Sequence, residues 1–152
     1  MAAGMTMTVI GARETAGTFS RLAAQSPGSI RAGLLAGGLL VQNAAKHNVR
    51  NLPLYKTGTL MRGITTEAVS DYEVKIGVDL GTVPYARIHE FGGVIKPKNG
   101  PFLVFEIGGQ VVRARSVTMP ARPYLRPALA ENREAVRKEV RDALFASLLG
   151  SL

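Results

Sequence analysis

The last quarter of the chain carries the pattern that most constrains its fold. Apolar residues recur at spacings of seven, four, four and four at Leu129, Val136, Val140, Leu144 and Leu148. This spacing places them on one face of a helix, and the opposite face is rich in charged residues. The sequence therefore predicts a long amphipathic helix that ends at Gly150 and packs its apolar stripe on the rest of the domain.

A second helix is predicted over residues 28–48, after Ser26 as N-cap and Pro27 in the first turn. The preceding residues 12–25 are weakly helical. The apolar run Ala32–Val41 is about half the roughly 20 residues that span a bilayer, so we expect a buried helix of a soluble protein.

This run contains Gly33, Gly37 and Gly38, which lower intrinsic helicity. Two explanations stay open. Small residues four apart let another backbone approach closely, or the helix merely tolerates glycines within a core.

Two hairpins are predicted between the helices, over residues 65–69 with 72–78 and residues 102–107 with 111–117. The first alternates apolar and polar residues from Tyr72 onward, and the second surrounds the turn Gly108-Gly109. A short helix over residues 84–91 separates them and stops at Gly92-Gly93. For Tyr85 and Phe91, on one face of this short helix, core packing is favoured over an interface role.

The order of elements indicates the α+β class, with a mainly antiparallel sheet of two hairpins, N-terminal helices and a long C-terminal amphipathic helix. The 152 residues suit one domain over residues 1–152. We expect residues 1–11 to be a candidate flexible segment, and residues 94–101 and 107–110 to be exposed loops.

Composition excludes several kinds of site. The chain has no Cys, which removes disulfides and thiolate metal sites, and its two histidines, His47 and His89, do not suffice for a histidine-rich centre. No Gly-rich loop has the sequence of a phosphate cradle. We expect no cofactor and no metal.

His89 and Glu90 form the only pair of a histidine next to an acid. Consecutive helical residues point in different directions, so the pair does not supply a base with its orienting group. Of the functions considered for this chain, an enzyme centred on these two residues is the one that the sequence supports least.

The net charge of +8 favours a nucleic-acid partner at first sight. The densest basic stretch holds Arg113, Arg115, Arg122 and Arg126 without an acid. It lacks interleaved aromatic residues and any DNA-reading motif. A basic nucleic-acid-binding protein without a reading motif remains the alternative function, beside a solvated strand face or salt bridges between subunits.

Three motifs help to distinguish among these possible functions. They are TGTLMRGI at 57–64, PYARIHEFGG at 84–93 and MPARPYLRPAL at 119–129. In this order and spacing they resemble the tail-completion or tail-terminator proteins of long-tailed bacteriophages, a family also labelled phage virion morphogenesis. The resemblance runs from about Val9 to Leu149.

The resemblance implies a non-enzymatic virion protein of the head–tail junction, made in the host cytoplasm. Such proteins form rings, commonly hexamers. The implied partners are further copies of the chain, the tail tube protein, the head–tail connector or stopper protein, and DNA that passes nonspecifically through the lumen. No membrane is involved.

A ring needs subunit contacts, and Arg and Tyr are typical anchors of interfaces. We expect Arg122, Tyr124 and Arg126 at or beside such a contact, although Tyr124 could equally seat the last helix. The loop 96–101 and the Gly108-Gly109 tip are candidates for docking a tube or connector protein. The full set of candidate interface residues is Arg113, Arg115, Arg122, Tyr124, Arg126, His89, Lys96 and Lys98.

Overall fold

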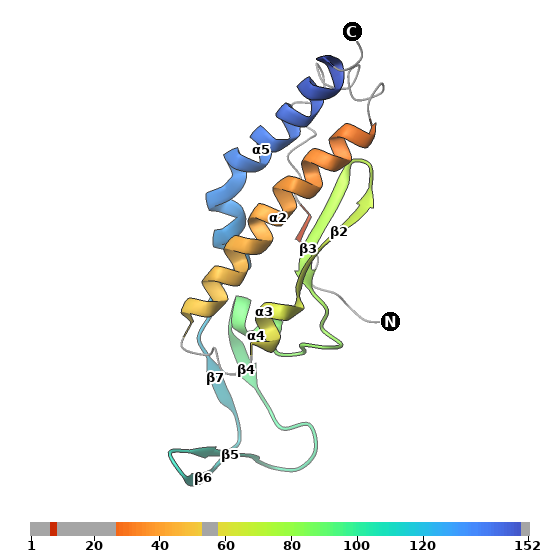
Figure 1. Cartoon of the computed structure of the whole chain (residues 1–152). Helices are drawn as coiled ribbons and strands as arrows, with labels where there is room; N and C mark the ends of the chain where they lie inside the picture. Colours follow the sequence, from red (N-terminus) through yellow and green to blue (C-terminus); the bar gives the residue numbers. More distant parts are fainter. Residues whose placement is uncertain (1–6, 9–26, 53–57, 150–152) are drawn as a thin grey trace.

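A computed structural model describes residues 7–8, 27–52 and 58–149 of the chain. The fold is α+β, as predicted, and Figure 1 shows its elements. In chain order they are β1 (Met7–Thr8), α2 (Pro27–Asn51), α3 (Thr59–Gly63), β2 (Ile64–Ser70), β3 (Glu73–Val78), α4 (Ala86–Phe91), β4 (Gly93–Ile95), β5 (Leu103–Ile107), β6 (Gln110–Ala114), β7 (Val117–Met119) and α5 (Leu125–Leu149).

The two long helices lie side by side, and α2 separates α5 from the sheet of β2 and β3 (Figure 1). Both helices were predicted. α2 begins at Pro27, and α5 begins at Leu125 with Pro127 in its first turn, where a missing N–H costs nothing. The predicted N-cap Ser26, the predicted helix 12–25 and the end of α5 at Gly150 lie outside the described residues.

The glycines of α2 permit close packing on two sides. A Cβ at Gly33 would lie 2.6 Å from the Cα of Val140 in α5, and one at Gly37 would lie 2.9 Å from Val136. A Cβ at Gly38 would lie 2.7 Å from Thr66 in the sheet. Of the two explanations for these glycines, the close approach of another segment of the chain is the one that the structure supports.

The first predicted hairpin is confirmed as β2 and β3, paired antiparallel. Val74, Ile76 and Val78 point into the core, but Tyr72 lies exposed in the turn because β3 begins at Glu73. β1 pairs with the other side of β3 and completes a three-stranded sheet in the order β1-β3-β2. Two residues are too few to give a periodic signal, so the sequence did not indicate β1.

The second predicted hairpin is confirmed as β5 and β6 around Gly108-Gly109, but its second strand ends at Ala114. The expected strand to residue 117 is wrong, because β7 pairs with β4 instead. Residues 96–102 and 115–116 separate the two ladders and differ in length, so one continuous antiparallel ladder cannot form. The two hairpins therefore belong to separate sheets.

The loop expected over residues 94–101 also begins later, since Val94 and Ile95 are part of β4. Residues 96–102 have no helix or strand, and the Gly108-Gly109 turn is exposed as expected. We call residues 93–119, which contain β4 to β7, the arm; Figure 1 shows it projecting from one end of the helical body.

The core lies where α2, the sheet and the start of α5 meet. Val41, Ala45 and Val49 of α2 are buried there, together with Tyr124 and Leu125 at the entrance to α5. The predicted charged face of α5 is exposed to solvent. Because Tyr124 and Leu125 follow the arm closely in the sequence, this core holds in place the end of the helical body from which the arm projects.

Candidate assembly surface

Glu90 joins the short helix α4 to the start of α5. Its buried carboxylate accepts hydrogen bonds from the backbone N–H groups of Tyr124 (2.8 Å), Leu125 (2.9 Å) and Arg126 (3.0 Å). The next residue, Pro127, has no N–H that needs a partner. Because the first amides of a helix lack partners inside the helix, one carboxylate from another element here caps α5.

Arg126 supplies the opposite charge. Its Nε lies 3.4 Å from Oε1 of Glu90, and its guanidinium lies 5.1 Å from the ring centroid of Phe91. A buried carboxylate is costly without hydrogen bonds and a counter-charge, and Glu90 has both. The half-exposed Arg126 is therefore paired within its own chain.

Backbone contacts also join the motifs at 84–93 and 119–129. The N–H of Arg122 donates to the carbonyl of His89 at 2.7 Å, and the side-chain amide of Asn48 donates to the carbonyl of Tyr124 at 3.1 Å. These bonds hold the segment before α5 against α4 on one side and α2 on the other.

Gly92 ends α4, as predicted, and permits the close passage of the segment before α5. Its φ of 68° is unfavourable for other residues, and an added Cβ would lie 2.7 Å from the backbone nitrogen of Ala121 and 2.9 Å from the carbonyl oxygen of Met119. The second and third motifs of the sequence thus form one interlocked junction.

His89 lies at this junction with its Nδ1 buried and without a hydrogen-bond partner among the described residues. Its ring meets that of Tyr85 edge to face at 5.6 Å between centroids. Burial first, and then the charge of Arg122, lower the pKa of His89 below its usual value of 6.5. The imidazole is therefore held in the neutral form near pH 7.

The junction does not have the arrangement of a catalytic pair. Both carboxylate oxygens of Glu90 are occupied by backbone amides of the α5 start, so Glu90 does not orient His89. The residues that the structure describes contain no group of three His, Cys, Asp or Glu that could hold a metal ion. What His89 and Glu90 do in this geometry is to fix α4 to α5.

Tyr124 is fully buried within the subunit, and its hydroxyl has no partner among the described residues. Burial, and then the charge of Glu90, raise the pKa of Tyr124 well above its usual value. Its side chain presents no surface to a partner. Of the two roles considered for Tyr124, seating α5 on the core is the one that this position supports.

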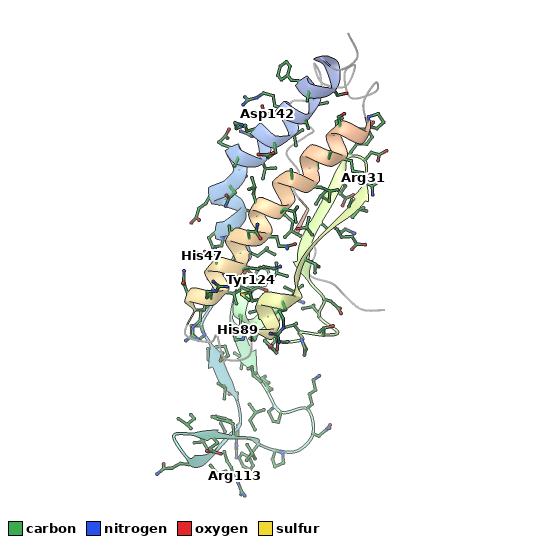
Figure 2. The ribbon with its side chains drawn as sticks, in the orientation of Figure 1. Arg31, His47, His89, Arg113, Tyr124 and Asp142 are labelled. Atoms are coloured by element: carbon green, nitrogen blue, oxygen red, sulfur yellow. The ribbon has the colours of Figure 1, made fainter. Side chains whose placement is uncertain are left out.

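The other candidate residues fall into two groups. Arg122 and Arg126 lie at the junction, whereas four others lie on the arm: Lys96, Lys98, Arg113 and Arg115. Figure 2 shows Arg113 on the projecting hairpin and both His89 and Tyr124 in the body. The basic stretch from Arg113 to Arg126 is therefore divided between the arm and the junction of α4 with α5.

The arm is unusual in exposing apolar side chains. None of its residues is fully buried, and Val104, Ile107 and Val111 are 63%, 63% and 71% exposed. The hairpin of β5 and β6 makes no extensive contact with another described element of the chain. A two-stranded hairpin is only marginally stable by itself in water, and exposed apolar side chains of this kind are typical of protein–protein contacts.

Tyr85 and Phe91 correct an expectation from the sequence. Both were expected in the core, but they are 40% and 48% exposed, while Ala86 and Glu90 occupy the buried face of α4. The reason is the cap: Glu90 must point inward to reach the start of α5. The aromatic side chains are left on the outside near the base of the arm.

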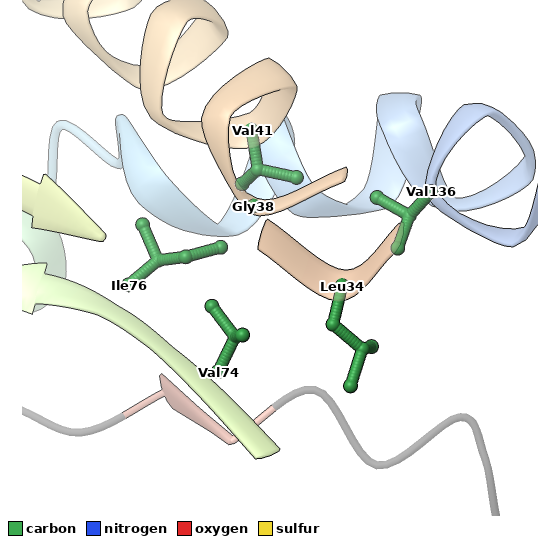
Figure 3. A pocket seen from close by; sticks show the side chains of 6 residues that line it. All are labelled: Leu34, Gly38, Val41, Val74, Ile76 and Val136. Carbon is green, nitrogen blue, oxygen red and sulfur yellow. The ribbon is translucent and has the colours of Figure 1, made fainter. Parts of the chain in front are cut away.

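A small apolar cavity lies between the layers of the body, and Figure 3 shows the side chains around it. Its volume is about 10 Å³, and it is lined by Leu34, Gly38, Val41, Val74, Ile76 and Val136. It has room for about one water molecule and offers almost no polar surface to hold one. It is a packing defect of the core rather than a ligand site.

Sequence reasoning missed the role of Glu90. A signal was present, because the residue before α5 is Tyr124 and not Ser, Thr, Asp or Asn, so the helix lacks a cap of its own. Glu90, the acid of the PYARIHEF segment, supplies the missing cap. Only the fold shows that Glu90 meets the start of α5.

In the described residues, no helix combines the length and the apolar character needed to cross a membrane. A model of the phage virion morphogenesis family matches residues 6–148, which include all three motifs and almost the whole described chain. No curated protein and no solved structure matches the chain. The match confirms the resemblance that the motifs indicated.

Proposed function

Because this chain belongs to the phage virion morphogenesis family, we propose that it acts in the neck of a long-tailed bacteriophage, as a ring that completes the tail and joins it to the head connector. In this role DNA passes through the lumen of the ring without being read. The family match over residues 6–148 carries the proposal.

The arm supports a role in assembly. Val104 and Val111 are exposed on one face of the hairpin and Ile107 on the other, and exposed apolar side chains of this kind are typical of a protein–protein contact. A body that carries a projecting hairpin suits a subunit whose hairpin is covered by a neighbour. A ring requires head-to-tail contacts of this kind, in which different surfaces of neighbouring subunits meet.

No catalytic step is part of the proposal. The family is one of structural virion proteins, and the junction of α4 and α5 uses its histidine and its carboxylate for packing and capping. The partners that we propose are further copies of the chain, the tail tube protein and the connector or stopper protein.

The alternative of a nucleic-acid-binding protein rests on the charge of +8. It is weakened because Arg126 is paired with Glu90, and because Arg113 and Arg115 lie on the arm, away from Arg122. A dedicated binder would bind duplex DNA tightly with a steep dependence on salt. Weak, nonspecific binding fits passage of DNA through a lumen.

The proposal is tested on the protein and on the particle. Light scattering of purified protein should give a closed oligomer, and a hexamer would have about six times the 16.2 kDa of one chain. Particles that lack the protein should accumulate as separate heads and tails. A chain that is monomeric at every concentration and also in intact particles would disprove the ring.

A further inference from the structure

The strand β2 offers an unpaired edge. In the described part of the chain β3 lies between β1 and β2, so β2 has a neighbouring strand on one side only. Its regular ladder with β3 runs over five residues, Ile64 to Ala68, before the pairing shifts near Ser70. Such an edge presents free backbone N–H and C=O groups that another strand can pair with.

The arm offers strands of the same length. β5 and β6 have five residues each and pair with one another, so each has one edge without a strand partner in the described chain. One face of this hairpin carries Leu103, Phe105, Ile107, Gln110, Val112 and Ala114, and the other carries Val104, Glu106, Val111 and Arg113. The first face is the more apolar one, and no helix or second sheet of the described chain covers it.

The two elements carry complementary charge. Residues 64–79, which include β2 and β3, hold four acidic residues and one basic residue, a net charge of −3 in a chain that is otherwise basic. The arm, residues 93–119, holds four basic residues and one acidic residue, a net charge of +3. Opposite charges on facing surfaces stabilise a contact and fix its register.

We infer that β6 of one subunit pairs with the free edge of β2 in a second copy of this chain, so that the arm extends the neighbour's sheet. The inference rests on the proposed function and names the contact through which the ring closes. β6 suits this edge better than β5, because β6 brings Arg113 toward Glu67, whereas β5 would bring Glu106 toward it.

The faces of the strands agree with this pairing. Glu67 alternates with Thr66 and Ala68, and Thr66 donates a hydrogen bond to the carbonyl of Gly38 in α2. When Arg113 lies on the face of Glu67, Val112 therefore lies on the face that α2 covers.

The contact can also propagate. In one chain the arm and the β2–β3 turn lie at opposite ends of the molecule, as Figure 1 shows. A subunit that donates its arm to one neighbour therefore keeps its own β2 edge free for the arm of another. This is a heterologous contact, the kind that generates a ring when the rotation closes.

Two charge-reversed variants test the pairing. Variant A carries Arg113→Glu and Arg115→Glu on the arm, and variant B carries Glu67→Lys and Glu73→Lys on the sheet. Each should associate at least about tenfold more weakly than wild type at low ionic strength, because like charges then face one another. Circular dichroism checks that both remain folded.

Mixing the variants gives the decisive result. The reversed arm of A meets the reversed sheet of B, and the normal arm of B meets the normal sheet of A. An equal mixture should therefore regain the wild-type mass by light scattering, with A and B alternating around the ring. Failure of the mixture to associate overturns the pairing of the arm with β2.

Matched controls reverse the same number of charges on the solvent face of α5. Arg133→Glu with Arg137→Glu, and Glu131→Lys with Glu134→Lys, should leave association unchanged, since these exposed side chains lie on α5, which takes no part in the proposed contact. If the controls weaken association as much as A and B do, the loss is an effect of net charge alone. That result would overturn the inference.

The outcomes for the contact and for the proposed function are distinct. If wild type forms a closed oligomer and variant A forms it equally well, the arm contact is wrong and the ring stands. A wild-type chain that is monomeric even at about millimolar concentration, the affinity range of the weakest specific contacts, overturns the arm contact. The neck role is then judged from particles that lack the protein.

Discussion

At the residue scale, the start of α5 depends on a side chain that is distant in the sequence. Tyr124 precedes the helix and cannot cap it, and Pro127 removes one donor in the first turn. The amides that remain converge on Glu90, which lies more than thirty residues earlier. The carboxylate therefore serves as a helix cap and as a link between two elements.

Replacing Glu90 with Gln should reduce the free energy of unfolding by about 1.5–3 kcal/mol. The amide removes the negative charge at the start of α5 and leaves one acceptor oxygen where two are used. Urea denaturation measures the loss. Glu131→Gln on the exposed face of α5 is the matched control, with an expected change below about 0.5 kcal/mol; equal losses in the two variants would argue against the cap.

The pH dependence of stability should carry a contribution from His89. Because its pKa is lowered in the folded state, the unfolded chain binds the proton more readily below the usual value of 6.5. Stability should therefore fall as the pH drops through 6.5, and this contribution should stop growing below the folded-state pKa. His89→Gln should flatten that part of the curve; an unchanged slope in the variant would rule out His89 as its source.

At the element scale, the spacing between the two long helices depends on glycine. Gly33→Ala places a methyl group against the backbone of Val140 and Glu139, which cannot move aside as a flexible side chain could. The variant should lose about 1–3 kcal/mol of stability, although alanine favours the helix itself.

Gly28→Ala in the same helix is the matched control. An added Cβ at Gly28 meets nothing within 4 Å, so the variant should gain up to about 1 kcal/mol from helix propensity. Thermal unfolding of the two variants compares them directly. Similar shifts at positions 28 and 33 would show that the helices do not depend on close contact.

The elements that could be predicted are those whose apolar residues recur at a regular spacing within the element itself. The stripe from Leu129 to Leu144 gave α5, and the alternation of Val74, Ile76 and Val78 gave β3. Elements set by distant partners could not be found in this way. β7 exists because Val117 pairs with Ile95, and the inward turn of α4 exists because Glu90 reaches Leu125.

The candidate site was predictable in part for the same reason. Residue type placed Arg113 and Arg115 among the candidate contact residues, and the structure places both on the exposed arm. Residue type could not separate them from Tyr124, whose burial is a property of the tertiary fold. Whether any of these residues contacts a neighbour stays a prediction until assembly is measured.

At the scale of the whole molecule, the body and the outer part of the arm should be separable. Ile95 and Val117 are cross-strand partners, so an Asn-Gly turn can replace residues 96–116 and close the ribbon of β4 and β7. The shortened chain should unfold with a free energy within about 1 kcal/mol of wild type, because no fully buried residue is removed.

The same chain should fail to form the closed oligomer. Light scattering and thermal unfolding on one sample give both results. A large loss of stability would show that the arm belongs to the core of its own subunit, and full assembly would show that neighbours do not need it.

The pairing of α2 with α5 also has a consequence for biosynthesis. α2 is translated early and α5 late, yet each is the main packing partner of the other. Until the ribosome has made α5, Gly33 and Gly37 face no second helix and Glu90 has no amides to accept. Contacts between such distant segments form late in folding. A chain truncated before α5 lacks the main packing partner of α2 and should therefore fail to reach the folded state.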